Sequence, residues 1–543
     1  MTHRTPRPRN RRLGLVAVVL TTTAALAGCA GTASDTASSD GLEPVSGGDW
    51  IQAVSSIPDC LDISQGNAPI HPGQSVVDNL FDQDPVTGEV LPWLAESYEV
   101  SDDGTSFTFH LKDGVTFSDG EEFDAEAVKL NFDGAVAAGE VGKAPLAAAY
   151  LLYYEGSTVI DELTLQVDFS EPKASFIQAL ADKPLGIIAP ASLEKSYEER
   201  CAEGVIGSGP FVIGEVVAGQ SVTIDRREGY AWASPLASNK GEAYLDTVTF
   251  QLVSEASVIT GGLLSGQINS ASVPASGAEE IVAAGLETQQ QVSGGLPLTL
   301  FLNLSNPLLA DDAVRQALNI GTDREEFNEV VGSRFTTVAT SVLSPNVPGY
   351  EDLSDLLAYD PDTAIAGLED AGWELGDDGV RTRDGERLSF EVEFVGTSPA
   401  FEALQQQWAE LGIELVLTPV TQAELTEWTA GSDWDIIYSS LSRTDPDVLL
   451  SVLDPDYSTR AALWPDFYPE LLEDIRLQST LTDEDERAAL VAEIQEDIIS
   501  NAYQIPLIDN GGAWAESEGS HGLFLSSISK PFFFDAWIEQ SAQ

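Results

Sequence analysis

Residues 91–132 constrain the fold of this chain most, because their turns and alternation predict a β-meander that ends in a helix. Asp102, Asp103 and Gly104 are typical of a tight turn. Residues 106–111 alternate polar and apolar side chains, which predicts a strand with one buried face. Asp124 is placed to cap the helix that follows. The apolar residues on one face of that helix are Ala125, Val128 and Phe132.

The ordered run of these residues resembles the signature region of family-5 extracellular solute-binding proteins, which serve peptide, nickel and opine ABC importers. The resemblance continues in residues 206–211 (Ile-Gly-Ser-Gly-Pro-Phe) and 311–318 (Asp-Asp-Ala-Val-Arg-Gln-Ala-Leu). It implies an α/β fold with two lobes, like that of the periplasmic binding proteins, and an enlarged first lobe of the cluster C type.

At 543 residues, the chain is long enough for two or three domains. Strand 388–394, helix 401–411 and strand 412–417 follow the βαβ order of an α/β lobe. Residues 296–303 and 502–508 predict the strands by which the chain crosses between the lobes. Together with the resemblance, the sequence predicts a lipoprotein signal peptide over 1–28, a flexible tether over 29–49, a first lobe over 50–298 and 507–543 with a subdomain inserted over about 85–195, and a second lobe over 299–506.

The N-terminus predicts export and a membrane anchor. An arginine-rich start leads into the apolar run 13–26, which is shorter than an ordinary membrane span. Residues 26–29 (Leu-Ala-Gly-Cys) resemble a bacterial lipobox, which implies cleavage before Cys29 and diacylation of its thiol. Two acyl chains hold a protein stably, so we expect it on the extracytoplasmic face of the cell membrane. A plain signal peptide with an unrelated cysteine is the alternative, and both the Sec and the twin-arginine routes stay open.

The net charge of the chain limits the classes of molecule that it can bind. The chain has 26 basic and 88 acidic residues, a formal net charge of −62. Such a surface repels phosphate backbones and anionic lipid head groups, so we exclude nucleic acid as a partner. The acidity favours solubility, and we expect a monomer.

Cys60 and Cys201 are the cysteines that follow Cys29. An even pair in an exported chain favours a disulfide over a metal site or a nucleophile. We expect no metal and no other cofactor, because no histidine stands at ligand spacing to another. The four histidines are His3, His71, His110 and His521.

The family resemblance implies where a ligand would bind. The loop after residues 60–67 and the turn at 206–211 border the ligand cleft in the family; the alternatives are a polar surface loop and a tight turn between strands. Trp514 is a candidate wall of the cleft or a core residue. Arg315 and Arg324 are expected to pair with acids at helix ends rather than to bind a ligand.

Ser442 and Arg443 are the most informative candidates. In peptide-binding relatives, an aspartate three residues before an Asp-Pro pair holds the α-ammonium of the peptide; here that position is Ser442. A serine does not supply the charge-assisted bond of a carboxylate, which disfavours ordinary oligopeptides. Arg443 suits an anionic or planar group, or else pairs at the surface with Asp445 or Asp447. The ligand-binding candidates are Gln65, Asn67, Ser208, Gly209, Asn303, Tyr438, Ser442, Arg443, Asp445 and Trp514.

These observations predict a non-catalytic lipoprotein that captures a peptide-like or other small polar solute between two lobes and delivers it to the permease subunits of an ABC importer. A ligand sensor on the same fold and a secreted hydrolase are the alternatives. The chain has neither a Gly-x-Ser-x-Gly elbow nor a His-Glu-x-x-His motif. A carboxylate pair for glycoside hydrolysis has no motif that would reveal it.

Overall fold

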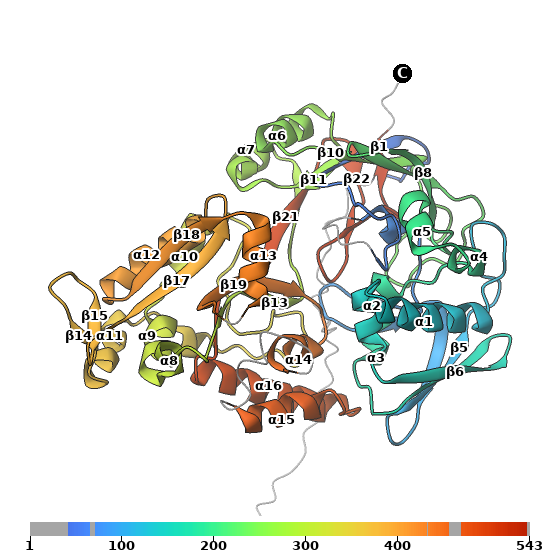
Figure 1. Cartoon of the computed structure of the whole chain (residues 1–543). Coiled ribbons are helices and arrows are strands. Elements are labelled where there is room, and N and C mark those ends of the chain that lie inside the picture. Colours follow the sequence, from blue (N-terminus) through green and yellow to red (C-terminus); the bar gives the residue numbers. More distant parts are fainter. Residues whose placement is uncertain (1–41, 66–70, 432, 456–467, 540–543) are drawn as a thin grey trace, which may run out of the picture. The chain divides into compact units, whose positions relative to one another are not determined.

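A computed structural model describes residues 42–65, 71–431, 433–455 and 468–539 of the protein (Figure 1). The predicted signal peptide, the lipidation site Cys29 and the ligand candidate Asn67 lie outside these residues. From Pro44 onward the chain forms a single compact unit.

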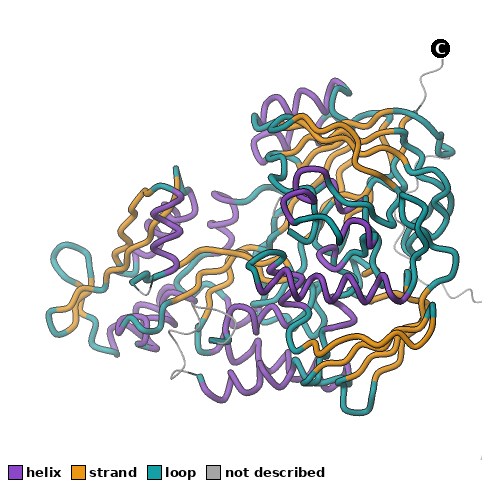
Figure 2. Tube along the Cα trace, turned by 45° about the vertical axis from the view of Figure 1, so that its right-hand side comes forward, coloured by secondary structure: helices purple, strands orange, loops and turns teal. Residues whose placement is uncertain are grey.

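The predicted meander is part of a four-stranded antiparallel sheet in the order β4-β5-β7-β6. On β5, the apolar residues of the alternating pattern are buried and the residues between them are more exposed. Helix α1 begins as predicted, because the side chain of Asp124 accepts a hydrogen bond from Ala127 N at 2.8 Å. Helix α1 lies along the sheet and contacts β6 and β7 (Figure 2). The bounds are β4 (Ala95–Val100), β5 (Ser106–Leu111), β6 (Tyr154–Asp161), β7 (Thr164–Phe169) and α1 (Ala125–Glu140).

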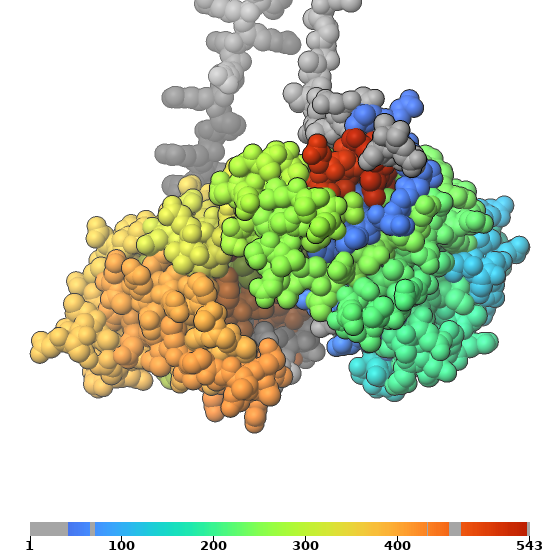
Figure 3. All heavy atoms as spheres, turned by 90° about the horizontal axis from the view of Figure 1, so that it is seen from above, coloured from blue at the N-terminus to red at the C-terminus, as the bar shows by residue number. Residues whose placement is uncertain are grey.

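A seven-stranded sheet brings together segments that are far apart in the sequence. Its order is β12-β21-β11-β1-β10-β9-β8, in which β1 pairs in parallel with β10 and β21 runs antiparallel to β11 and β12. The C-terminal segment therefore lies beside the first part of the described chain (Figure 3). The bounds are β1 (Asp49–Val54), β8 (Phe211–Val217), β9 (Ser221–Arg226), β10 (Thr247–Leu252), β11 (Ser270–Ser272), β12 (Glu287–Val292) and β21 (Gly511–Glu516).

The two predicted crossing strands pair with each other. Strand β13 (Gly295–Leu302) lies between β19 (Ile436–Ser442) and β20 (Gln504–Ile508), antiparallel to both. The predicted βαβ unit is also present, because β17 and β18 pair in parallel on either side of helix α12 in the sequence. Its bounds are β17 (Ser389–Val395), α12 (Pro399–Glu410) and β18 (Glu414–Val420).

The remaining elements are mostly short helices and two-residue or three-residue strands. The helices are α2 (Pro145–Tyr150), α3 (Phe176–Ala179), α4 (Pro190–Leu193), α5 (Tyr197–Glu203), α6 (Ala256–Ser265), α7 (Ala278–Ala283), α8 (Pro307–Ala310), α9 (Asp312–Ile320), α10 (Arg324–Val331), α11 (Pro361–Asp370), α13 (Gln422–Ala430), α14 (Asp447–Leu453), α15 (Pro469–Gln478) and α16 (Glu484–Ser500). The strands are β2 (Phe81–Gln83), β3 (Val90–Pro92), β14 (Glu374–Leu375), β15 (Arg381–Arg383), β16 (Glu386–Arg387), β22 (Ser520–His521), β23 (Phe524–Leu525), β24 (Pro531–Phe532) and β25 (Trp537–Ile538).

The hydrophobic core is divided into separate clusters. The largest takes all its buried residues from 296–508, and a second takes its residues from 80–232. A third joins residues 50–250 to residues 514–536. The division falls where the crossing strands were expected and supports the proposed lobe boundaries, which stay a prediction.

Arg315 and Arg324 are buried and lie away from the candidate site. Arg315 pairs with Asp312 at 3.1 Å, as expected for a helix end. The expectation is wrong for Arg324, which donates to the carbonyl groups of Asn319, Leu357 and Pro506 and to the Asn319 side chain. Main-chain carbonyl groups therefore satisfy this guanidinium where an acid was predicted.

Candidate functional site

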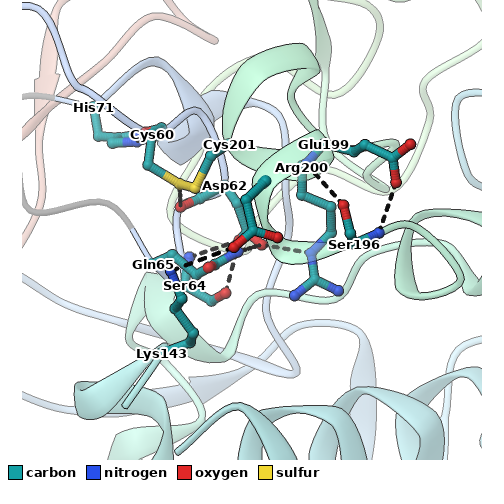
Figure 4. Close-up of a disulfide and its surroundings, with 11 residues drawn as sticks. Cys60, Asp62, Ser64, Gln65, His71, Lys143, Ser196, Glu199, Arg200 and Cys201 are labelled. Carbon is teal, nitrogen blue, oxygen red and sulfur yellow. Dashed lines mark hydrogen bonds and ion pairs between the residues drawn. A yellow bond between two sulfur atoms is a disulfide. The ribbon is translucent and has the colours of Figure 1, made fainter. Parts of the chain in front are cut away.

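Cys60 and Cys201 form the predicted disulfide (Figure 4). Beside the bridge, the buried carboxylate of Asp62 forms an ion pair with Arg200 at 2.8 Å. The same carboxylate accepts hydrogen bonds from Ser64 N at 3.0 Å and from Gln65 Nε2 at 2.7 Å. The amide of Gln65 thus helps to hold its own loop, which favours the structural alternative for this candidate.

Ser208 and Gly209 lie in the turn before β8 and are buried. Ser208 Oγ accepts a hydrogen bond from Asp78 N at 3.1 Å, and the Ser208 carbonyl accepts one from Arg227 Nη1 at 2.8 Å. A Cβ atom on Gly209 would lie 2.6 Å from Val76 O, so only glycine fits this close approach. Both residues therefore serve the packing of the turn, and their place beside a ligand stays a prediction.

Ser442 ends strand β19, where the two crossings meet. Its hydroxyl oxygen accepts hydrogen bonds from Ser293 Oγ at 2.9 Å and from Asn510 Nδ2 at 3.2 Å. Ser293 precedes β13 and Asn510 precedes β21. The Ser442 side chain therefore joins three segments of the chain through uncharged hydrogen bonds.

Arg443 is half-buried and faces the segment that carries helix α2. Its guanidinium lies 5.0 Å from the centre of the Tyr150 ring, and its Nη1 donates to Ser451 Oγ at 2.5 Å. The alternative that Arg443 pairs with Asp445 or Asp447 is wrong, because Arg487 pairs with both, at 2.6 Å and 3.3 Å. The buried carboxylate of Asp445 also accepts from Asp447 N at 2.8 Å, so it has a structural role at the start of α14.

Thr444 links residues that are remote in the sequence. Its Oγ1 donates to Gln83 Oε1 at 2.5 Å, and its carbonyl accepts from Gln178 Nε2 at 2.9 Å. The ammonium group of Lys173 lies 3.9 Å from the Asp447 carboxylate. These contacts join the segments that were predicted to belong to different lobes.

A cavity of about 40 Å³ lies between these segments. Residues 149–182 supply one wall and residues 443–451 supply the other. Burial raises the pKa of Asp182, which accepts a hydrogen bond from the Tyr150 hydroxyl. Burial also raises the pKa of the Tyr150 hydroxyl, which therefore keeps its proton and acts as the donor. The charged residues that line the cavity are Lys173, Asp182, Arg443, Asp445 and Asp447.

The other three described candidates lie in packed surroundings. Asn303 is buried, and its Nδ2 donates to the Trp434 carbonyl at 2.6 Å. Tyr438 is half-buried and packs its ring against Phe327 and Phe401, and burial raises the pKa of its hydroxyl. Trp514 is 6% exposed and belongs to the core beneath the seven-stranded sheet, which favours the core alternative.

Sequence reasoning missed Tyr150, Lys173, Gln178 and Asp182. None of them stands in a motif, and each reaches the cavity only because distant segments come together. Within the described residues, no three His, Cys, Asp or Glu side chains are grouped to hold a metal ion. The described part of the chain also contains no helix with the length and apolar character needed to span a bilayer.

The sequence has recognisable relatives. The model of the bacterial extracellular solute-binding proteins, family 5 (middle region), matches residues 89–461. The chain is 30% identical to the nickel-binding periplasmic protein of Escherichia coli K12 over 335 residues, or 60% of each protein. It is 27% identical to the glutathione-binding protein GsiB of Salmonella paratyphi A over 469 residues, which cover 82% of this chain and 85% of GsiB. The match to the nickel-binding protein thus spans less than two thirds of that protein.

Solved structures share the fold. NikA from Brucella suis, in complex with Fe(III)-EDTA, has a TM-score of 0.78 at 23% identity, over 91% of this chain and 100% of NikA. The oligopeptide-binding protein AppA from Bacillus subtilis, in complex with a nonapeptide, has a TM-score of 0.72 at 20% identity, over 92% and 100%. These likenesses confirm the expected α/β fold of the periplasmic binding proteins. With the family match over most of its length, the chain belongs to family 5 of the bacterial extracellular solute-binding proteins, which bind solutes for transport and are not enzymes.

Proposed function

We propose that this chain is a lipid-anchored, extracytoplasmic receptor that captures a small polar solute between two lobes and delivers it to an ABC permease. Its family membership supports the transport role. The cavity that holds Arg443 supports the place of capture, because its walls come from the two parts of the chain that were predicted to form different lobes. Crevices between domains are the usual sites for small molecules in such receptors.

The lipid anchor rests on the sequence around Cys29. We infer that the chain is cleaved before this residue and is held by two acyl chains on its thiol. Residues 30–43 then act as a tether between the membrane and the compact unit that starts at Pro44. The predicted tether was too long at its end, because Gly47 and Gly48 donate hydrogen bonds to Tyr244 and Asp246 of that unit. We infer that the receptor works as a monomer, with its large negative charge keeping copies apart.

Relatives bind different solutes, so their names do not decide the ligand of this chain. The similar proteins include a nickel-binding protein, a glutathione-binding protein and an oligopeptide-binding protein. Ser442 offers no charge to an α-ammonium group, and its hydroxyl oxygen already accepts two hydrogen bonds. We therefore place the solute outside the class of simple peptides with a free amine.

Two measurements test the proposed function. Native mass spectrometry of the full-length protein should find a co-purifying small molecule, and deletion of the gene should abolish uptake of that molecule by cells. Mass spectrometry of the purified wild type should find Cys29 as the first residue, with two acyl chains on it, whereas the variant Cys29→Ser should carry none. Undiminished uptake in the deletion strain would contradict the transport role and favour a sensor; an unmodified Cys29 in the wild type would contradict the anchor.

A further inference from the structure

Among the described residues, Arg443 differs from the other buried or half-buried arginines because it has neither an acid partner nor a set of main-chain acceptors. In the described part of the chain, no ion pair joins it to a carboxylate, and its side chain has two hydrogen-bond partners, Ser451 and the hydroxyl oxygen of Tyr150. Arg227 and Arg324 also lack an acid partner, but they direct several N–H groups at main-chain carbonyl oxygens. A guanidinium carries five N–H donors, so Arg443 keeps most of its donors unused.

Lys173 is a second cation with unused donors in the same cavity. The residue is 6% exposed, and its ammonium group lies 3.9 Å from Asp447, which is too far for a good hydrogen bond. No hydrogen bond from this ammonium group is found in the described part of the protein. Buried ammonium groups normally have hydrogen-bond partners, so the cavity is short of acceptors next to Lys173.

The acidic residues around the cavity already accept hydrogen bonds from other parts of the protein. Asp445 accepts two hydrogen bonds from Arg487, at 2.6 Å and 3.0 Å. Asp447 accepts from Gln478 Nε2 at 2.9 Å, and Asp182 accepts from Lys183 N at 2.8 Å and from Tyr150. The formal charges of Arg443, Lys173 and Arg487 balance these three acids, but the unused hydrogen-bonding capacity lies on the two cations that face the cavity.

The size and walls of the cavity restrict the group that fits. The cavity volume of about 40 Å³ is enough for roughly three water molecules, at about 10–15 Å³ each. A carboxylate also has three heavy atoms, so a group of this size fits the cavity. The Tyr150 ring supports one face of the guanidinium and keeps its planar fork in a fixed orientation. Such a fork matches the two oxygens of a carboxylate better than it matches a single acceptor.

We propose that Arg443 and Lys173 bind a carboxylate group of the transported solute, which would make the ligand a carboxylic acid or a carboxylate-bearing complex. This inference rests on the proposed function, since it names the chemical class of solute for the same site. The contrary explanation is that the stacking of Arg443 on Tyr150 merely holds the two segments together. In that case, replacement of Arg443 would lower stability and leave the preference for acids unchanged.

The test uses the full-length protein and isothermal titration with citrate and succinate, alongside succinamide as the uncharged counterpart of succinate. We expect at least one acid to bind and succinamide to bind at least about tenfold more weakly than succinate. The variant Arg443→Gln should weaken binding of the acid about tenfold or more, as expected for the loss of a charge-assisted pair worth about 1.4 kcal/mol or more. Lys173→Gln should weaken it in the same direction.

Arg334→Gln is the matched control, because Arg334 pairs with Glu279 in an exposed position away from the cavity and its loss changes the charge equally. Arg443→Lys keeps the charge without the fork and should fall between wild type and Arg443→Gln. It also provides a folded variant if Arg443→Gln melts early. Equal affinity of wild type and Arg443→Gln, or equal loss in Arg334→Gln, would overturn the inference. Binding of neutral solutes but none of the acids would overturn it and leave the proposed function standing; failure of the uptake experiment would overturn the function itself.

Discussion

Removal of the disulfide between Cys60 and Cys201 should lower the stability of the compact unit by a predictable amount. The bridge closes a loop with a sequence separation of 141 residues. In the chain-entropy model, a loop of this length restricts the unfolded chain by about 5 kcal/mol, which is an upper value because unfolded chains keep some structure. The neighbouring ion pair between Asp62 and Arg200 stays in place, so the loss concerns mainly the unfolded state.

The corresponding change in melting temperature follows from the size of the protein. Unfolding entropy near 60 °C is about 2.1 cal/mol/K per residue, which gives about 1 kcal/mol/K for the unit Pro44–Gln543. A loss of about 5 kcal/mol therefore lowers the melting temperature by about 5 °C. The perturbation is the double variant Cys60→Ala/Cys201→Ala, because a single replacement would leave a reactive thiol.

Calorimetry of wild type and double variant, each with and without a phosphine reductant, measures the effect. The reductant should lower the melting temperature of the wild type toward that of the variant and should leave the variant unchanged. Thiol titration of the unfolded wild type confirms that reduction exposes both cysteines. Wild type and variant that melt at the same temperature would refute the view that this long loop is restricted mainly by the bridge.

Two further predictions concern the ligand and the pH. Di- and tripeptides with a free amine should raise the melting temperature by less than about 1 °C at millimolar concentration, and Ser442→Asp should increase the shift; a large shift with wild type would contradict our argument from Ser442. Burial raises the pKa of Glu516 to about 7, so its favourable contribution is complete below about pH 4.5 and is lost as the pH rises through about 7. The free energy of unfolding measured in urea should therefore fall between pH 5 and pH 8, by up to about 3 kcal/mol from this group. Glu516→Gln should flatten that fall, and an equally steep fall in this variant would count against the assignment.

Features with local causes could be predicted from the sequence. The cap at Asp124, the alternation of β5 and the order β17-α12-β18 each depend on residues that are neighbours in the chain. The disulfide followed from the number of cysteines and the signs of export. These signals were enough for the family and the fold class, because side-chain periodicity and turn chemistry act over a few residues.

The candidate site depends on contacts that no local pattern contains. Thr444 meets Gln178 and Gln83 across 266 and 361 residues of sequence. One alternative paired Arg443 with Asp445 or Asp447, but Arg487 pairs with both acids and Arg443 lies against the Tyr150 ring. The partners of Arg324 could not be predicted for the same reason. The carbonyl groups that accept hydrogen bonds from its guanidinium come from segments that only the folded chain brings together.

The position of β21 has a consequence for the order in which the protein folds. This strand lies between β12 and β11, so the seven-stranded sheet lacks an inner member until the segment after residue 510 has been synthesised. Until then, β11 and β12 present open edges that invite pairing with other chains. A seven-stranded sheet that closes only with its last segment is thus expected to form late, which would suit a protein that folds after it has crossed a membrane.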